Sequence, residues 1–333
     1  MSRAQEIAYA LNHPIAQALH PGKAEFVTRR ELSPKLNPGA AYGLRVSALI
    51  MFGRLPHIKA IPALQMLRED YEAGKYVGVH TLVVPSSGNT AHAAARLAPA
   101  FGFKHVKVVL ASDVPESKRG IISALASTTI ISPEGGKSVE QEARELAQLP
   151  GHYLLDQYNH HGNYRSHLLF TGPAIWNACD RDLEYIAIGM GSAGTLIGVS
   201  RALKRTNTKR VQVIGVRPLP GERVPGVRDA ARMESVLNPE FRRMAADAAD
   251  HLVEVGRKES FIAMRELWSE VEPQPAPSGA LACVGLRKWI ASLSAKEKEK
   301  LAGRHAAFIC PDDGRFYSER IEGELDPDQG LVH

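Results

Sequence analysis

The pattern of apolar positions changes from about residue 80 onward, where short runs rich in Val and Ile alternate with longer segments of helical period. The first run, residues 81–84, leads into a turn-forming cluster and then into an alanine-rich helix over residues 91–101. Further strands are predicted at residues 106–110, 128–131, 153–155, 185–188 and 211–216. Strands separated by helices in this way are typical of an α/β fold with mostly parallel sheets.

Helical spacing is also clear in two other segments. A helix is predicted over residues 62–73, and Leu196, Val199 and Leu203 form one apolar face after the glycine-rich residues that precede them. The first fifty residues give no clear element because prolines interrupt them, and residues 325–333 are expected to form a loose tail.

Length and composition indicate a globular protein. With 333 residues, the chain exceeds the roughly 100–200 residues of a typical domain, so one large α/β unit or two lobes sharing a cleft is expected. Hydrophobic residues make up 44% of the chain and charged residues 23%. No run of about 18 apolar residues occurs, so we expect no signal peptide, no membrane span and a cytoplasmic location.

Charge and cysteine usage narrow the possible partners. The formal net charge is +5, but basic residues alternate with acids, as in residues 68–70 and 296–300, which we interpret as solvated helix surface and not as a nucleic-acid site. Cys179, Cys283 and Cys310 lie far apart, so we expect small buried residues and neither a disulfide framework nor a zinc site. The histidines show no metal-ligand spacing, so no metal site is predicted.

A glycine-rich stretch, residues 189–195, follows one predicted strand and opens a predicted helix. Free backbone N–H groups at such a helix start bind phosphate, and Ser192 and Thr195 add hydroxyl groups. The stretch therefore predicts a phosphate site. Glycines retained only for packing are the alternative.

The same glycines also allow a second class of enzyme. Gly189, Gly191 and Gly194 fit the G-x-G-x-x-G spacing of a dinucleotide-binding dehydrogenase. Such a site needs an acid after the next strand to hold the ribose hydroxyls, whereas Arg217 stands there. An arginine could instead hold the extra phosphate of NADP. The dehydrogenase interpretation is therefore weakened but stays open.

A series of motifs resembles those of the cysteine synthase family, the fold-type II pyridoxal phosphate enzymes that include cystathionine β-synthase and serine dehydratase. Pro85-Ser86-Ser87-Gly88-Asn89-Thr90 resembles the P-T-S-G-N-T loop of that family, and the glycine-rich stretch resembles its G-V-G-T-G-G-T loop. The other matching motifs are at residues 56–59, 156–159, 171–176, 277–280 and 311–314. The resemblance covers roughly residues 53–318.

The resemblance implies the chemistry of the site. Lys59 would carry pyridoxal phosphate as a Schiff base and then remove the α-proton of an amino-acid substrate. The cofactor ring would accept the electrons, so that a leaving group departs from the β-carbon and an aminoacrylate remains. A single lysine among 41 basic residues is ordinarily a surface charge, but Lys59 lies between apolar residues at a predicted helix start.

The resemblance also implies a set of binding residues. Those expected to hold the cofactor are Lys59, Asn89, Gly191, Ser192, Ala193, Gly194, Thr195 and Ser278. Those expected to hold the substrate are Ser86, Ser87, Gly88, Thr90, Gln157, Gly226 and Arg228. Asn89 would bind the ring hydroxyl of the cofactor. The alternative is a plain N-terminal cap of the following helix, and the two roles are compatible.

Three departures from the family pattern mark a divergent member. Ala60-Ile61 replaces the Asp-Arg that usually follows the lysine, so the helix must be anchored differently. Pro277 replaces the serine expected at the pyridine nitrogen, which leaves Ser278 as the alternative partner. Arg228 replaces a small residue and could bind a second carboxylate or phosphate of the substrate, or pair with Asp229 or Glu222.

The resemblance predicts β-replacement on an activated serine, such as O-acetylserine or O-phosphoserine, by a nucleophile such as sulfide. The alternatives are β-elimination by an ammonia lyase or desulfhydrase, and a non-catalytic binding module on the same fold. A smaller mobile lobe over residues 53–160 is expected, with residues 1–52 and 161–333 forming a larger phosphate-binding lobe and the cofactor in the cleft between them. A homodimer is expected from the family.

Overall fold

The computed structural model describes residue 17 and residues 26–318, except residues 54, 87, 112, 113, 115, 126 and 207–210. The chain divides into two units. The first unit contains Lys59–Ser166, and the second contains Ala24–Ile58 and the chain from His167 onward. Residues 161–166, expected in the larger lobe, belong to the first unit because the helix they form packs against the helix that follows Lys59.

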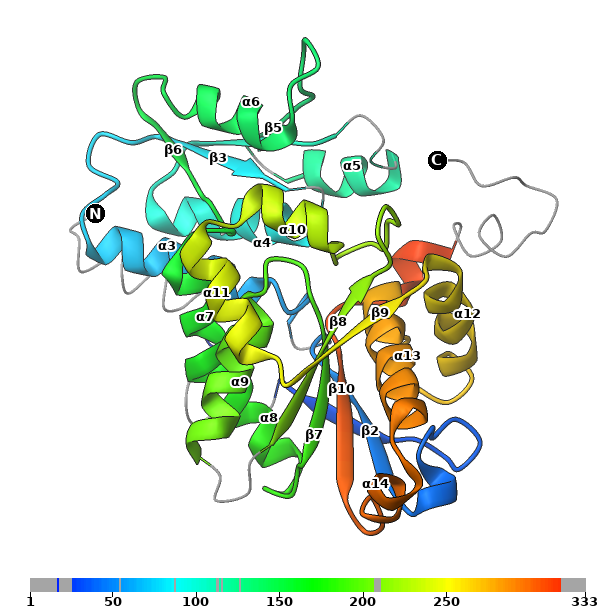
Figure 1. Ribbon diagram of the computed structural model, residues 1–333. Coiled ribbons are helices and arrows are strands. Elements are labelled where there is room, and N and C mark those ends of the chain that lie inside the picture. The colour runs from blue at the N-terminus through cyan, green and yellow to red at the C-terminus, as the bar shows by residue number, and fades with distance from the viewer. Residues whose placement is uncertain are drawn as a thin grey trace, which may run out of the picture. The chain divides into compact units, whose positions relative to one another are not determined.

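The first unit is built on a four-stranded parallel sheet with the order β5-β4-β3-β6. Its strands are β3 (Thr81–Pro85), β4 (His105–Val109), β5 (Thr128–Ile131) and β6 (His152–Leu154). Its helices are α3 (Ala60–Glu72), α4 (Asn89–Leu97), η2 (Ala98–Phe101), α5 (Glu116–Ser123), α6 (Val139–Leu146) and α7 (His161–Ser166). Helix α6 covers one face of the sheet and α4 the other (Figure 1).

The second unit is built on a six-stranded sheet with the order β1-β2-β10-β7-β8-β9, in which only the β1–β2 pair is antiparallel. Its strands are β1 (Thr28–Glu31), β2 (Arg45–Ile50), β7 (Tyr185–Gly189), β8 (Gln212–Pro218), β9 (His251–Val255) and β10 (His305–Cys310). Its helices are η1 (Ala40–Tyr42), η3 (His167–Thr171), α8 (Gly172–Ala178), α9 (Gly194–Thr206), α10 (Ala230–Val236), α11 (Pro239–Ala248), α12 (Arg257–Leu267), α13 (Pro277–Ser292), α14 (Ala295–Glu299) and η4 (Gly314–Tyr317).

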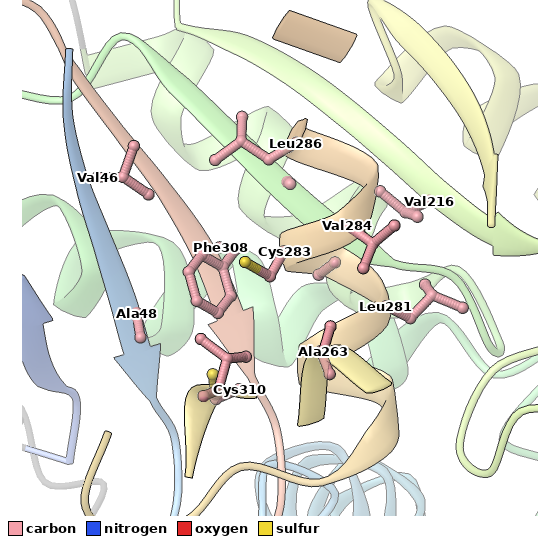
Figure 2. Close-up of a cluster of buried hydrophobic side chains, with 14 of the residues drawn as sticks. Val46, Ala48, Val216, Ala263, Leu281, Cys283, Val284, Leu286, Phe308 and Cys310 are labelled. Carbon is pink, nitrogen blue, oxygen red and sulfur yellow. The ribbon is translucent and has the colours of Figure 1, made fainter. Parts of the chain in front are cut away.

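The core of the second unit lies between this sheet and helix α13 (Figure 2). Phe308 of β10 and Cys283 of α13 are buried there, as is Cys310. All three cysteines of the chain are buried, as predicted. Burial raises the pKa of the Cys283 thiol to about 12, so this sulfur behaves as an apolar atom at neutral pH.

The predicted α/β fold with mostly parallel sheets is confirmed. The strand predicted at residues 128–131 has those bounds, and the other predicted strands are found with ends shifted by one or two residues. The predicted helix over residues 91–101 consists of α4 and the 3-10 helix η2, whose second residue is Pro99. No helix in the described part of the chain combines the length and apolarity needed to cross a bilayer.

The interpretation of residues 68–70 as solvated surface is wrong for one residue. Arg68 is exposed and pairs with Glu72 one helical turn later. Asp70, in contrast, is only 1% exposed. A buried carboxylate needs hydrogen-bond donors around it, which a linear charge pattern does not reveal. Residues 325–333 lie outside the described residues.

Candidate active site

The glycine-rich loop lies between the end of β7 and the start of α9, as predicted. A Cβ atom on Gly191 would lie 2.6 Å from the carbonyl oxygen of Gly226, which is closer than real Cβ contacts allow. Ala193 has a φ of 60°, a left-handed conformation that non-glycine residues rarely adopt. The close approach of the loop to the backbone of Gly226 therefore requires glycine at position 191. The tight turn of the loop lies at Ala193.

Thr195 contacts His167, a residue to which no role was assigned from the sequence. Its Oγ1 lies 3.2 Å from Nε2 of His167, and Nδ1 of His167 lies 2.8 Å from Oγ1 of Thr171. His167 is fully buried. Because a lone histidine in a sequence is usually a solvated or satisfied residue, only the packing of η3 against α9 could reveal this arrangement.

Ser278 lies in the first turn of α13, where Pro277 is a favourable first residue because its missing N–H is not needed. The Ser278 Oγ donates a hydrogen bond to Oδ1 of Asp312 over 3.2 Å, and the Tyr317 hydroxyl donates to Oδ2 over 3.1 Å. A Cβ atom on Gly226 would lie 3.5 Å from the Ser278 Oγ. Asp312 and Tyr317 have no role among the predicted site residues, although Asp312 belongs to the motif at residues 311–314.

The segment around Arg228 is joined to the glycine-rich loop. The backbone N–H of Arg228 donates to the carbonyl oxygen of Met190 over 2.8 Å. The neighbouring Asp229 is buried and caps α10 by accepting from the backbone N–H of Arg232 over 2.8 Å. Thus the glycine-rich loop, residues 226–228 and the start of α13 converge within the second unit.

Lys59 stands immediately before α3, in the helical conformation of its N-cap position, and is half-buried. Ala60 and Ile61, which follow it, are fully buried. Apolar packing therefore anchors this end of the helix. At these two positions the motif of the cysteine synthase family usually has Asp-Arg. The preceding residue, Ile58, donates its N–H to the carbonyl oxygen of Pro311 over 2.8 Å.

Asn89 is the first residue of α4 and directly follows the loop that connects β3 to this helix. Gly88, and not Asn89, is the N-cap residue of α4, so the interpretation of Asn89 as a plain helix cap is wrong. Ser86 is buried, and its Oγ accepts from the backbone N–H of Gly88 over 3.4 Å. Ser87 lies outside the described residues.

Two of the predicted substrate-binding residues meet in the first unit. The Thr90 Oγ1 donates to Oε1 of Gln157 over 2.8 Å, and both residues are buried. The side chain of Asn163 donates to the carbonyl oxygen of Gln157 over 2.5 Å. On α4, burial and the nearby Arg96 lower the pKa of His92, which is therefore neutral at neutral pH.

These residues fit a phosphorylated cofactor. The loop of residues 189–195 has no room for a side chain at Gly191, ends at the N-terminus of a 13-residue helix and contains the buried Ser192. Such a cradle of backbone N–H groups suits a phosphate. Within the described residues, no group of three or more His, Cys, Asp or Glu side chains could hold a metal ion.

Comparison with known proteins agrees with this geometry. Residues 57–310 match the family described as "Pyridoxal-phosphate dependent enzyme". Cysteine synthase B of Pseudomonas aeruginosa is 28% identical over 265 residues, which cover 79% of this chain and 84% of that protein. Cysteine synthase B of Escherichia coli is 26% identical over 277 residues, covering 82% and 86%.

Solved structures share the fold. The crystal structure of an O-ureido-L-serine synthase matches with a TM-score of 0.74 and 21% identity, over 92% of this chain and 94% of that one. An O-acetylserine dependent cystathionine β-synthase from Helicobacter pylori matches with a TM-score of 0.73 and 22% identity, over 92% and 96%.

The chain belongs to the family of pyridoxal-phosphate dependent enzymes, and pyridoxal 5'-phosphate is its cofactor. It is a divergent, cysteine synthase-like member, as the motifs predict. The dehydrogenase interpretation of the glycine-rich loop is therefore wrong. Arg217, the residue that kept it open, instead pairs with Glu254 of the neighbouring strand over 2.9 Å.

Proposed function

We propose that this enzyme catalyses β-replacement on an activated serine-type amino acid, with Lys59 as the residue that binds the cofactor and moves the α-proton. The hydrogen bond between Thr90 and Gln157 carries the proposal, because it joins two separate segments expected to hold the substrate carboxylate. The similarity to cysteine synthases over most of the chain supports it. No observation favours β-elimination or a binding module over this reaction.

When bound, pyridoxal phosphate supplies an aldehyde for the substrate amine and a ring that takes up the electron pair released at the α-carbon. The Nζ of Lys59 would hold the cofactor covalently and would move the α-proton of the substrate. The amides of residues 191–195 would hold the phosphate, Asn89 would bind the ring hydroxyl, and Ser278 would bind the ring nitrogen.

The substrate carboxylate binds to residues 86–90 and Gln157. Because Oε1 of Gln157 accepts the hydrogen bond from Thr90, the amide nitrogen of Gln157 is the end that donates to the carboxylate. Ser86, Ser87 and the backbone at Gly88 supply further small donors. A loop with such donors binds one carboxylate and leaves the β-carbon of the substrate free to react.

Arg228, two residues after Gly226 in the segment joined to the phosphate loop, binds a second anionic group on the substrate. The alternative is an ion pair with Asp229 or Glu222, whose carboxylates also accept hydrogen bonds from backbone N–H groups. Asp229 accepts from Gly221 and Arg232, and Glu222 accepts from Arg257. A guanidinium group suits a carboxylate or a phosphate through two parallel hydrogen bonds.

A homodimer, a cytoplasmic location and closure of a mobile smaller lobe are further parts of the proposal. The homodimer rests on the family resemblance, and the location is an expectation from the sequence. Light scattering of the purified enzyme tests the first. A mass of one 333-residue chain in solution contradicts the dimer.

The visible absorption spectrum tests the proposal. The purified protein should be yellow and Lys59→Ala should lose this band, whereas the control Lys104→Ala, an exposed lysine of the same unit, should keep it. Serine, O-acetylserine, O-phosphoserine and cysteine are then added in turn, with and without sulfide. A shifted band with release of a new β-substituted amino acid supports replacement, and release of a keto acid indicates elimination. A protein that stays colourless with added pyridoxal phosphate contradicts the proposal.

A further inference from the structure

A buried carboxylate on α3 joins three segments of the first unit. Asp70, near the end of that helix, is 1% exposed. Its Oδ1 lies 2.7 Å from Nζ of Lys75 and 2.9 Å from Nε2 of His160, and its Oδ2 accepts from the Tyr153 hydroxyl over 2.9 Å. Three donors from different segments satisfy this carboxylate, and the donor from His160 comes from the loop that carries Gln157.

The second ring nitrogen of His160 fixes its tautomer. Nδ1 accepts a hydrogen bond from the backbone N–H of Gly162 over 2.8 Å, so Nδ1 carries no proton. The ring proton is therefore on Nε2, where it is donated to Asp70. His160 thus connects α3 to the start of α7.

Hydrogen bonds within the loop between β6 and α7 connect His160 to the residues around Gln157. Asp156 accepts from the backbone N–H of Tyr158 over 2.9 Å and from the side chain of Asn159 over 2.8 Å. The backbone N–H of His160 donates to the carbonyl oxygen of Asp156 over 3.1 Å. The side chain of Asn163 also donates to the carbonyl oxygen of Gln157. Residues 156–163 are therefore linked to one another by hydrogen bonds.

A second contact holds α7, the helix that follows this loop, against α3. Arg165 of α7 pairs with Glu69 over 2.6 Å. A Cβ atom on Gly162 would lie 2.8 Å from Nδ1 of His160 and 2.9 Å from Oε2 of Glu69. Glycine at this position therefore permits the close approach that the contact between Asp70 and His160 requires.

We infer that Asp70 and His160 are positioning residues that hold the Gln157 loop in its substrate-binding place against the helix that follows Lys59. This inference rests on the proposed role of Gln157. Neither residue touches the substrate. They fix the orientation of the Gln157 side-chain amide. The substrate class is amino acids, which Gln157 binds through the carboxylate.

The test compares three variants. His160→Ala removes the donor from the loop, His160→Gln restores a donor and an acceptor, and Lys75→Ala removes a different partner of Asp70 without touching the loop. We expect His160→Ala to raise KM for the amino-acid substrate about tenfold, with kcat and the affinity for pyridoxal phosphate changed less than about twofold. His160→Gln should recover most of the loss, and Lys75→Ala should lower the melting temperature but leave KM unchanged.

Amide hydrogen exchange of residues 156–163 provides a readout that does not depend on activity. It should accelerate in His160→Ala and not in Lys75→Ala. Unchanged exchange in His160→Ala, or an equal rise of KM in both alanine variants, overturns the inference. If the wild type binds no amino acid at all, the proposed function fails, while the exchange data still decide whether His160 holds the loop.

Discussion

Thr90 and Gln157 lie 67 residues apart in the chain, and the Thr90 Oγ1 donates a hydrogen bond to Oε1 of Gln157 over 2.8 Å. Thr90 belongs to α4, whereas Gln157 follows β6. Both side chains are buried, at 3% and 6% exposure. The contact sets the orientation of the Gln157 amide, and its removal should therefore affect substrate binding before it affects the cofactor.

Thr90→Val keeps the shape of the side chain and removes the donor. Leaving the buried amide oxygen of Gln157 without this partner costs about 1–3 kcal/mol, so KM for the amino acid should rise about tenfold. The visible band of the cofactor should stay unchanged. The control Thr129→Val replaces an exposed threonine of the same unit and should leave KM unaltered. An unchanged KM in Thr90→Val would contradict the proposed role of this residue.

Gly191→Ala should weaken binding of pyridoxal phosphate. The added Cβ would lie 2.6 Å from the carbonyl oxygen of Gly226, so the phosphate loop must move. We expect the dissociation constant of the cofactor, measured by fluorescence titration of the apoenzyme, to rise at least about tenfold. Gly120→Ala is the control, since a Cβ there meets no atom within 4 Å. Equal cofactor affinity in the two variants would show that the loop does not hold the phosphate.

Arg228→Ala should discriminate between substrates. If its guanidinium binds a second anionic group, KM should rise about tenfold or more for O-phosphoserine and change little for O-acetylserine, because only the first carries a second charge near the β-carbon. The control is Arg243→Ala, an exposed arginine of α11. Steady-state kinetics with both substrates measures the effect. A uniform effect on both substrates, or none, rules out recognition of a second anion by Arg228.

The stability of the protein should depend on pH through Asp70. Burial by itself raises the pKa of Asp70, but hydrogen bonds from His160, Lys75 and Tyr153 outweigh it, so the pKa lies below the ordinary value of 3.8. The contribution of the carboxylate is therefore complete above pH 3.8 and is lost as the pH falls through the lower pKa of the folded state.

Replacement of Asp70 tests this dependence. Asp70→Ala should lower the free energy of unfolding by about 2 kcal/mol at neutral pH, because hydrogen bonds to a charged group are lost. The difference from wild type should shrink in acid below pH 3.8, as followed by urea unfolding. Asp247→Ala, at an exposed position of α11, should change stability by less than about 0.5 kcal/mol. A deficit that stays constant with pH would mean that the ionised carboxylate is not responsible.

Local sequence was sufficient to predict the strands and helices with a clear apolar pattern and the loops between them. The run at residues 128–131 and the glycine-rich loop after β7 were located directly, because propensity and turn chemistry act over a few residues. Strands β1, β2, β9 and β10 were not predicted. Strands β2 and β10 carry Ala48, Ala306 and Ala307, and alanine has low strand propensity, so they lack the Val- and Ile-rich runs from which the other strands were predicted.

The sequence by itself determined the class of this protein, namely an α/β enzyme with a phosphate loop, a lysine before a helix and an Asn-Thr loop. Only the tertiary structure decided which side chains support these motifs. His167 behind Thr195, Asp312 beside Ser278 and the contact of His160 with Asp70 join residues far apart in the chain. A motif can be recognised in the sequence because adjacent residues determine its backbone conformation. A buried polar residue depends instead on partners that only folding brings within hydrogen-bond distance.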